Sequence, residues 1–397
     1  MMPTSENSEV KNCAEFLSPR SKKWKGIDVH AESEQDGRQL LATLKEGLQM
    51  SNVLVLAGSG TSMGQTAGPS MGDLWHRCMA TAAPGSSANG PRLSGEEIAR
   101  KLSYSGNNIE DLLSRCELEL RIKEDFDVAS FVTFSKAQIL EACSSFLKTP
   151  DIQLNTHEKL LRRLARRRAR DPRVKVFTTN YDTCFETAAG RLGLVVMDGF
   201  SFSRPRRFDP KYFSYDVTRR TSYREDKATP LEGVFHLLKL HGSVTWERNG
   251  SAIEEREHPN PKDACLVYPQ SGKYQQAFEQ PHLELVSQYL SALREPNTCI
   301  FVVGFGFNDS HLSTPLMEAV KTNPHLKLVV VGPAAKVNVA GPPSPWTTLH
   351  SLSEDGEDVW FINAGFDQFV DLLPDLKASG SVDRLARELK NLIAGEQ

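Results

Sequence analysis

Several signals that place a protein in a special class are missing from this sequence. Its seven cysteines are dispersed and no two are spaced as C-x-x-C, which removes the usual zinc-ribbon signature and an obvious disulfide framework. No apolar run approaches the roughly 18 residues that a membrane span requires. The polar segment 1–20 lacks the apolar region of a signal peptide. The formal net charge of -3 gives no basic excess. These absences favour a cytoplasmic protein with reduced thiols and no membrane partner.

Internal repeats and a G-x-x-x-x-G-K-[ST] phosphate-binding motif are also missing, so the sequence has no ATPase signature of its own. Of its 397 residues, 39% are hydrophobic and 24% are charged, a balance typical of a folded chain with a sizeable core. This length suits one large domain with insertions, or two ordinary domains.

Short apolar runs that end in glycine or polar residues alternate with helical patterns along the chain. Strands are expected at 52–57, 174–179, 234–240, 299–304, 326–332 and 361–363, and helices at 35–49, 73–79 and 366–373. The alternation predicts an α/β protein with a Rossmann-like, doubly wound parallel sheet.

The expected organisation follows from composition along the chain. Residues 1–50 form an N-terminal extension, polar and loose to about residue 33, that ends in a helix. The α/β domain covers 51–375, and a C-terminal helix covers 376–397. Within the domain, a leucine-rich and glycine-poor stretch at about 82–170 predicts a helical insertion subdomain. An aperiodic stretch at about 200–232 predicts a flap that gates a site or forms an oligomer interface.

Two motifs follow the first two expected strands. Gly58 and Gly60 come directly after 52–57, and closely spaced glycines let a backbone approach a pyrophosphate. A tight turn without a ligand is the alternative. Asn180 and Asp182 follow 174–179, at the edge where parallel sheets bind ligands. Asp182 has the alternative role of capping the next helix.

Two further motifs follow later strands. His241, next to a glycine, comes after 234–240 and can act as a general base, although a lone histidine there is often structural. Gly304 and Gly306 lead into Asn308 and Asp309, a turn that could hold the far end of a dinucleotide. A plain helix cap is the alternative for Asp309.

In these stretches the chain resembles the sirtuin superfamily, and specifically its bacterial branch associated with phage defence. The matching segments are Gly58-Ser-Gly-Thr-Ser62, Gly68-Pro69, Thr179-Asn-Tyr-Asp182, His241-Gly242 and Gly304-Phe-Gly-Phe-Asn-Asp309. They span roughly residues 50–375.

The resemblance implies a role for each matching residue. Asn180 would orient a water and the ribose, and His241 would be the general base, so these two are the expected catalytic residues. Asp182 would contact the nicotinamide carboxamide. Residues expected to bind NAD are Ala57, Gly58, Ser59, Gly60, Thr61, Ser62, Asp182, Gly304, Gly306, Asn308 and Asp309.

The sequence also departs from the sirtuin pattern. Sirtuins carry a four-cysteine zinc module after the His-Gly pair, whereas only Cys265 and Cys299 follow His241 here. No zinc and no metal ligand are therefore expected, and protein deacylation is disfavoured. Thr179 stands where sirtuins have glutamine, and residues 181–240 separate Asn180 from His241, a longer gap than in a typical sirtuin.

The resemblance therefore implies an NAD+ hydrolase that releases nicotinamide and ADP-ribose and depletes NAD in anti-phage defence. It also implies a homo-oligomer and a separate HerA-type hexameric ATPase as a partner. The alternatives are a non-catalytic regulatory subunit that binds NAD or ADP-ribose, and an NAD-dependent protein deacylase.

Direct nucleic-acid binding is left open by one basic stretch. Seven arginines fall between Arg162 and Arg173. A solvated helix face is favoured for them, because the chain as a whole is not basic.

Overall fold

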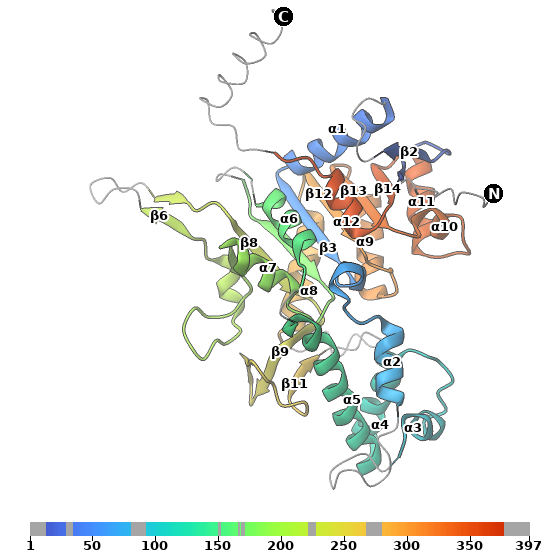
Figure 1. Cartoon of the computed structure of the whole chain (residues 1–397), viewed down its shortest axis with the longest axis vertical. Helices are drawn as coiled ribbons and strands as arrows, with labels where there is room; N and C mark the ends of the chain where they lie inside the picture. The colour runs from blue at the N-terminus through green and yellow to red at the C-terminus, as the bar shows by residue number, and fades with distance from the viewer. Residues whose placement is uncertain are drawn as a thin grey trace, which may run out of the picture.

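The computed structural model describes residues 13–28, 35–80, 93–149, 152–165, 167, 171–220, 228–266 and 280–376 (Figure 1). Its centre is a nine-stranded sheet in the order β2-β1-β14-β13-β12-β3-β4-β8-β5. The strands from β14 to β5 in this order are parallel. Their bounds are Val359–Asn363 (β14), Leu326–Gly332 (β13), Thr298–Val303 (β12), Asn52–Ala57 (β3), Val174–Thr178 (β4), Val234–Lys239 (β8) and Val195–Met197 (β5). The expected strands and the doubly wound α/β class are confirmed.

One edge of the sheet differs from the expectation. β1 (Cys13–Leu17) pairs antiparallel with β14, and β2 (Lys25–Asp28) pairs antiparallel with β1. A loose entry is therefore wrong for residues 13–28, and two strands that the sequence pattern does not predict extend the sheet beyond β14. The segment is polar in sequence, but Ala14, Phe16 and Ile27 are buried because β14 gives these short strands a partner and a core to pack on.

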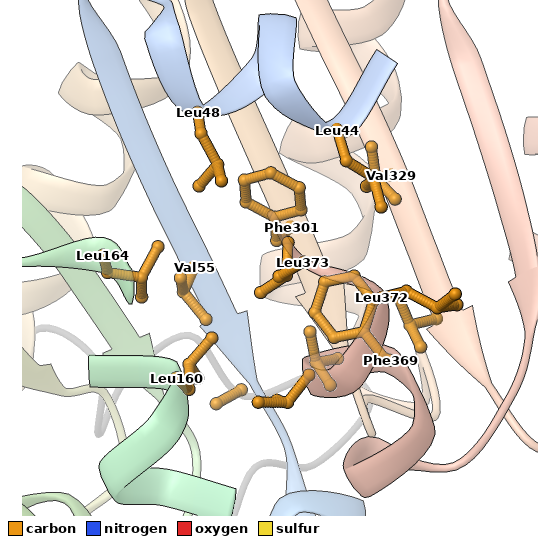
Figure 2. Packing of buried hydrophobic residues seen from close by; sticks show 14 of the residues in the cluster. Leu44, Leu48, Val55, Leu160, Leu164, Phe301, Val329, Phe369, Leu372 and Leu373 are labelled. Atoms are coloured by element: carbon orange, nitrogen blue, oxygen red, sulfur yellow. The ribbon is translucent and has the colours of Figure 1, made fainter. Parts of the chain in front are cut away.

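Helices cover both faces of the sheet. Along β3, Val53, Val55 and Ala57 belong to one buried cluster, while Leu54 and Leu56 belong to the cluster on the opposite face. Figure 2 shows part of the first cluster, in which Leu44 and Leu48 of α1 lie near Phe301 and Val329, Leu160 of α6 lies near Val55, and Phe369 of α12 lies further along the same face. The helices of this face are α1 (Gln35–Gln49), α6 (Asn155–Leu164), α7 (Cys184–Leu192) and α12 (Phe366–Leu372); those of the other face are α8 (His282–Arg294), α9 (Ser310–Thr322), α10 (Ala335–Val339) and α11 (Pro345–Asp355).

The strand order reverses its direction at β3. From β3 the chain proceeds to β4 on one side, and it later places β12 on the other side. In an open parallel sheet, such a switch point leaves a crevice outside the carboxyl ends of the two strands, where ligands bind. The crevice here lies beyond Ala57 and Val303.

A helical subdomain lies beyond the carboxyl ends of the central strands (Figure 1). α2 (Met71–Met79), α3 (Gly95–Lys101), α4 (Ile109–Ile122) and α5 (Phe126–Ser145) pack around a third apolar cluster, which also includes Tyr181, Val244, Ala264 and Leu266. α6 belongs instead to the core of the main sheet. Within the described residues, no helix is both long and apolar enough to span a membrane.

After His241 the chain forms a second, antiparallel sheet that the sequence pattern does not predict. β9 (Gly242–Asn249) lies between β10 (Ala252–Glu255) and β11 (Ala264–Leu266). Two ion pairs join the described part of the 200–232 stretch to β10: Arg206 pairs with Glu255 at 2.6 Å, and Arg207 pairs with Glu254 at 3.0 Å. That stretch also contains a helical turn at Pro210–Ser214 and two short strands, β6 (Thr218–Arg220) and β7 (Ala228–Pro230), which pair antiparallel. The expected C-terminal helix lies outside the described residues except for Leu376.

Candidate active site

Two glycine turns interlock at the switch point. The Gly58 amide donates to the Val303 carbonyl (3.0 Å), and the Gly60 amide donates to the Gly304 carbonyl (2.9 Å). Gly304 has φ +62°, and a Cβ there would lie 2.7 Å from the Gly60 Cα. Only glycine tolerates this conformation and this backbone contact. The first and fourth sequence motifs are therefore packed against each other.

Asn180, after β4, is held by the first of these turns. Its Nδ2 donates to the Thr61 Oγ1 (3.0 Å) and the Ser62 Oγ (2.7 Å), and the residue is 8% exposed. With both amide hydrogens engaged, Oδ1 is the atom that can accept a hydrogen bond from a ligand or a water.

Asp182 lies one residue before Thr183, the N-cap of α7, so it does not occupy the N-cap position that the helix-cap alternative expected. Its Oδ1 accepts from the Cys184 amide (3.0 Å) at the start of α7. The buried Lys239 donates to the Asp182 carbonyl and pairs with Glu186 at 3.1 Å, which ties the end of β8 to α7. Asp182 is 7% exposed and its side chain still borders the main cavity described below.

His241 lies between β8 and β9 and is 3% exposed. Its Nε2 is 3.4 Å from the Nε2 of His311, in the first turn of α9. Burial lowers the pKa of His241 to about 3, and burial together with His241 lowers the pKa of His311 to about 4. Both rings are therefore neutral at physiological pH.

Asp309 stands at the N-cap position of α9, but its side chain makes no capping hydrogen bond. It lies instead beside His241 and His311. Burial raises the pKa of its carboxyl to about 6, against the opposing effect of His311. The alternative of a plain helix cap is therefore wrong for the Asp309 side chain, which lies beside the two histidines instead.

Two cavities flank the turn that follows β3. The first, of about 440 Å³, is lined by Ser59, Ser62, Asn180, Asp182, His241, Gly306, Asn308 and Asp309 among others. The second, of about 360 Å³, is lined by Gly60, Thr61 and Gly304, together with apolar residues such as Val331 and Phe366. Two of the expected binding residues lie elsewhere: Ala57 ends β3 in the core, and Gly58 is packed against the backbone of Gly304 and Phe305.

The site also contains residues that sequence reasoning missed. Glu110, in the first turn of α4, lines the first cavity and accepts a hydrogen bond from the Tyr181 hydroxyl (2.9 Å). Burial raises the pKa of Glu110 to about 8, and Asp309 adds to this effect. His157 of α6 lines the second cavity with neither ring nitrogen hydrogen-bonded. Of these residues, only His311 could have been found from the sequence, because it follows Asp309 by two residues. Glu110 and His157 reach the site only through the tertiary fold.

Residues 174–340 match a family described as the SIR2-like domain. The match runs from β4 to the end of α10, so it includes Asn180, His241 and the Gly304 turn but not the Gly58 turn. The fold and the site thus define a doubly wound α/β protein in which residues 174–340 are similar to a SIR2-like domain.

Solved structures of Sir2 homologues are remotely similar to the chain. One, a mutant Sir2 homologue in complex with 2'-O-acetyl ADP ribose, is 14% identical, with 87% of this chain and 96% of that chain covered and a TM-score of 0.39. Another, a Sir2 homologue in complex with NAD, is 14% identical, with 87% and 94% covered and a TM-score of 0.36. No curated protein matches the chain.

Proposed function

We propose that this protein hydrolyses NAD+ at the bond between nicotinamide and ribose. The observation that carries the proposal is the meeting of Asn180 and His241 in one polar cavity at the switch point of the sheet. A purely structural role would not require both residues to line the same cavity. The match of residues 174–340 to the SIR2-like domain supports the same conclusion.

The two cavities suit the two halves of a dinucleotide. The first is rich in hydrogen-bonding groups and would take the nicotinamide riboside half, while the more apolar second cavity would take the adenosine half. The turn at 58–62 lies between them, and its backbone amides and hydroxyls would hold the pyrophosphate. His157 would offer an otherwise unpaired ring nitrogen to the adenosine half.

The reaction breaks the C1'–N bond, and both electrons leave with nicotinamide, whose positive charge is thereby neutralised. The sugar passes through an oxocarbenium-like transition state. The oxygen of a water then bonds to C1', and the water gives up one proton. The products are nicotinamide, ADP-ribose and a proton.

The protein's part is to position the reactants and to stabilise developing charge. The Asn180 Oδ1 would accept a hydrogen bond from the attacking water or the ribose, because its Nδ2 is held by Thr61 and Ser62. The neutral ring of His241 would accept a proton from a ribose hydroxyl or the water. Carboxyl groups at Asp182 and Asp309 would favour positive charge on the sugar.

The test is to incubate the purified full-length protein with NAD+ and to separate the products by chromatography. The variants Asn180→Ala and His241→Ala are run beside it, with the exposed His325→Ala as a matched control. We expect nicotinamide and ADP-ribose from the wild type and the control, and rates lower by about 10²–10⁴ in the two site variants.

Other outcomes discriminate between the alternatives. NAD+ binding without turnover, with and without a candidate ATPase and nucleic acid, would replace the hydrolase by a regulatory subunit that binds NAD or ADP-ribose. Turnover only in the presence of an acylated peptide would indicate a deacylase.

We further propose a cellular setting from the sirtuin resemblance. NAD+ depletion would serve anti-phage defence, in a homo-oligomer that acts with a HerA-type hexameric ATPase. The catalytic unit would be residues 51–375. Co-purification of the two proteins and the mass of their complex would test this pairing.

A further inference from the structure

Within the described part of the chain, one group of side chains has the composition of a transition-metal site. His241, Asp309 and His311 each offer one ligand atom, and these atoms all lie within 4.8 Å of one another. The three come from two turns that the sheet brings together: His241 follows β8, and the other two open α9 after β12. Two imidazoles and a carboxylate are ligands that Zn²⁺ and its neighbours in the first transition row accept.

The spacing of the two histidines matches metal coordination better than a direct hydrogen bond. Their Nε2 atoms are 3.4 Å apart. For comparison, N–H···O hydrogen bonds in proteins are most often about 2.9–3.0 Å long. Two nitrogens bound to one tetrahedral Zn²⁺, each about 2.0–2.1 Å from the metal, lie about 3.3–3.4 Å apart. The two rings therefore already stand at the separation that a shared metal ion requires, and the Asp309 carboxylate offers an oxygen within 4.8 Å of both ring nitrogens.

The surroundings favour a cation and leave it accessible. The described lining of the cavity contains the carboxyl groups of Asp111, Asp182 and Asp309, together with Glu110, which is protonated at neutral pH, and no lysine or arginine. Two of the three ligands, His241 and Asp309, line this cavity of about 440 Å³. Three protein ligands leave a fourth tetrahedral position for a water or another ligand. The site uses no cysteine, so it is distinct from a four-cysteine structural zinc module.

We propose that His241, Asp309 and His311 form a binding site for a divalent transition-metal ion of the Zn²⁺ class, and that the bound ion inhibits the enzyme. The ion coordinates the Nε2 atom of His241. The lone pair on this nitrogen is then no longer available to accept a proton in the reaction. Binding of the ion stands on the geometry alone, whereas the inhibition rests on the proposed NAD+ hydrolysis.

Binding is measured first, on metal-free full-length protein titrated with Zn²⁺ in competition with a chromophoric chelator. Co²⁺ replaces Zn²⁺ in a second titration, because tetrahedral Co²⁺ has a visible absorption band. We expect one equivalent bound by the wild type and by His325→Ala, and affinity lower by at least about ten-fold in His311→Ala and Asp309→Asn. Circular dichroism and the thermal midpoint without metal show whether each variant is folded, and Asp309→Asn is the nearly isosteric second variant if His311→Ala is not.

Inhibition is measured next, as the rate of NAD+ hydrolysis with Zn²⁺ and after addition of a chelator. We expect Zn²⁺ to suppress turnover of the wild type and the chelator to restore it. Absence of stoichiometric Zn²⁺ binding, or equal affinity in the folded His311→Ala and Asp309→Asn variants, would overturn the site whatever the turnover. Zn²⁺ binding by the three residues in a protein without turnover would keep the site and reject only the proposed function. Binding with undiminished turnover would reject the inhibition.

Discussion

At the scale of single residues, burial in this protein suppresses charge on the groups that would otherwise carry it. His241 and His311 have lowered pKa values, and Glu110 has a raised one, with burial as the largest cause in each case. At neutral pH the candidate site therefore contains neutral imidazoles and a protonated carboxyl. Groups perturbed in this way and gathered in one cavity are typical of functional sites.

His157 provides a prediction at this scale that concerns stability. Its ring is fully buried between Phe185 and Phe366, neither nitrogen is hydrogen-bonded, and burial lowers its pKa to about 4. Above pH 6.5 the residue is neutral in both the folded and the unfolded chain. Below that pH only the unfolded chain gains the proton, so the free energy of unfolding falls until about pH 4.

We expect His157→Leu to remove this residue's share of the acid sensitivity. On acidification from pH 7.5 to pH 5, the free energy of unfolding of the variant should fall by about 2 kcal/mol less than that of the wild type. Thermal midpoints measured across this range check it, with the exposed His258→Leu as the control. Parallel curves for the wild type and His157→Leu would show that His157 is not neutral in the folded protein.

At the scale of elements, the site depends on the two interlocked turns after β3 and β12. We expect Gly304→Ala to lower the free energy of unfolding by about 2–4 kcal/mol, because alanine disfavours the native φ of +62° and its Cβ would lie 2.7 Å from the Gly60 backbone. Displacement of the turn that holds Thr61 and Ser62 would also release Asn180, so NAD+ affinity should fall. Denaturation and isothermal titration measure the two effects.

Gly190→Ala is the matched control for this substitution. Gly190 lies within α7, no atom is within 4 Å of its added Cβ, and its φ is not positive. Alanine favours helix over glycine by about 0.5–1 kcal/mol. An equal loss in the two alanine variants would contradict the role assigned to the turn contact.

At the scale of the whole molecule, part of the sheet contributes to stability but lies far from the candidate site. β1 is fully paired yet lies beyond β14, β13 and β12 from the switch strand β3. Phe16 of β1 is fully buried and stacks with Trp360, with ring centroids 6.1 Å apart. We expect Phe16→Ala to lower stability by about 3–5 kcal/mol and to leave the KM for NAD+ unchanged in the folded fraction.

Thermal denaturation and steady-state kinetics at a temperature below the transition check this expectation. Val337→Ala is the control, since Val337 is 72% exposed and its truncation should change stability by no more than about 0.5 kcal/mol. A KM that rises in Phe16→Ala would show that the distant edge communicates with the site.

The parallel core was predictable because its strands are buried on both faces. β3, β12 and β13 are continuous apolar runs, each followed by glycine or polar residues, and local composition is enough to mark them. The sequences of β1, β2 and the strands β9 to β11 do not show this pattern. These strands are stabilised by pairing with particular neighbours, and a strand's partner is not encoded in its own few residues.

The same division holds for the site. The sequence by itself determined that glycine turns, Asn180 and His241 follow successive buried strands, because parallel strands present their carboxyl ends at one edge. Only the tertiary structure decided that α4 brings Glu110 to Tyr181, that α6 brings His157 to the second cavity, and that His311 lies 3.4 Å from His241. Such contacts join residues far apart in the chain, and they exist only once the sheet has set the distance between its strands.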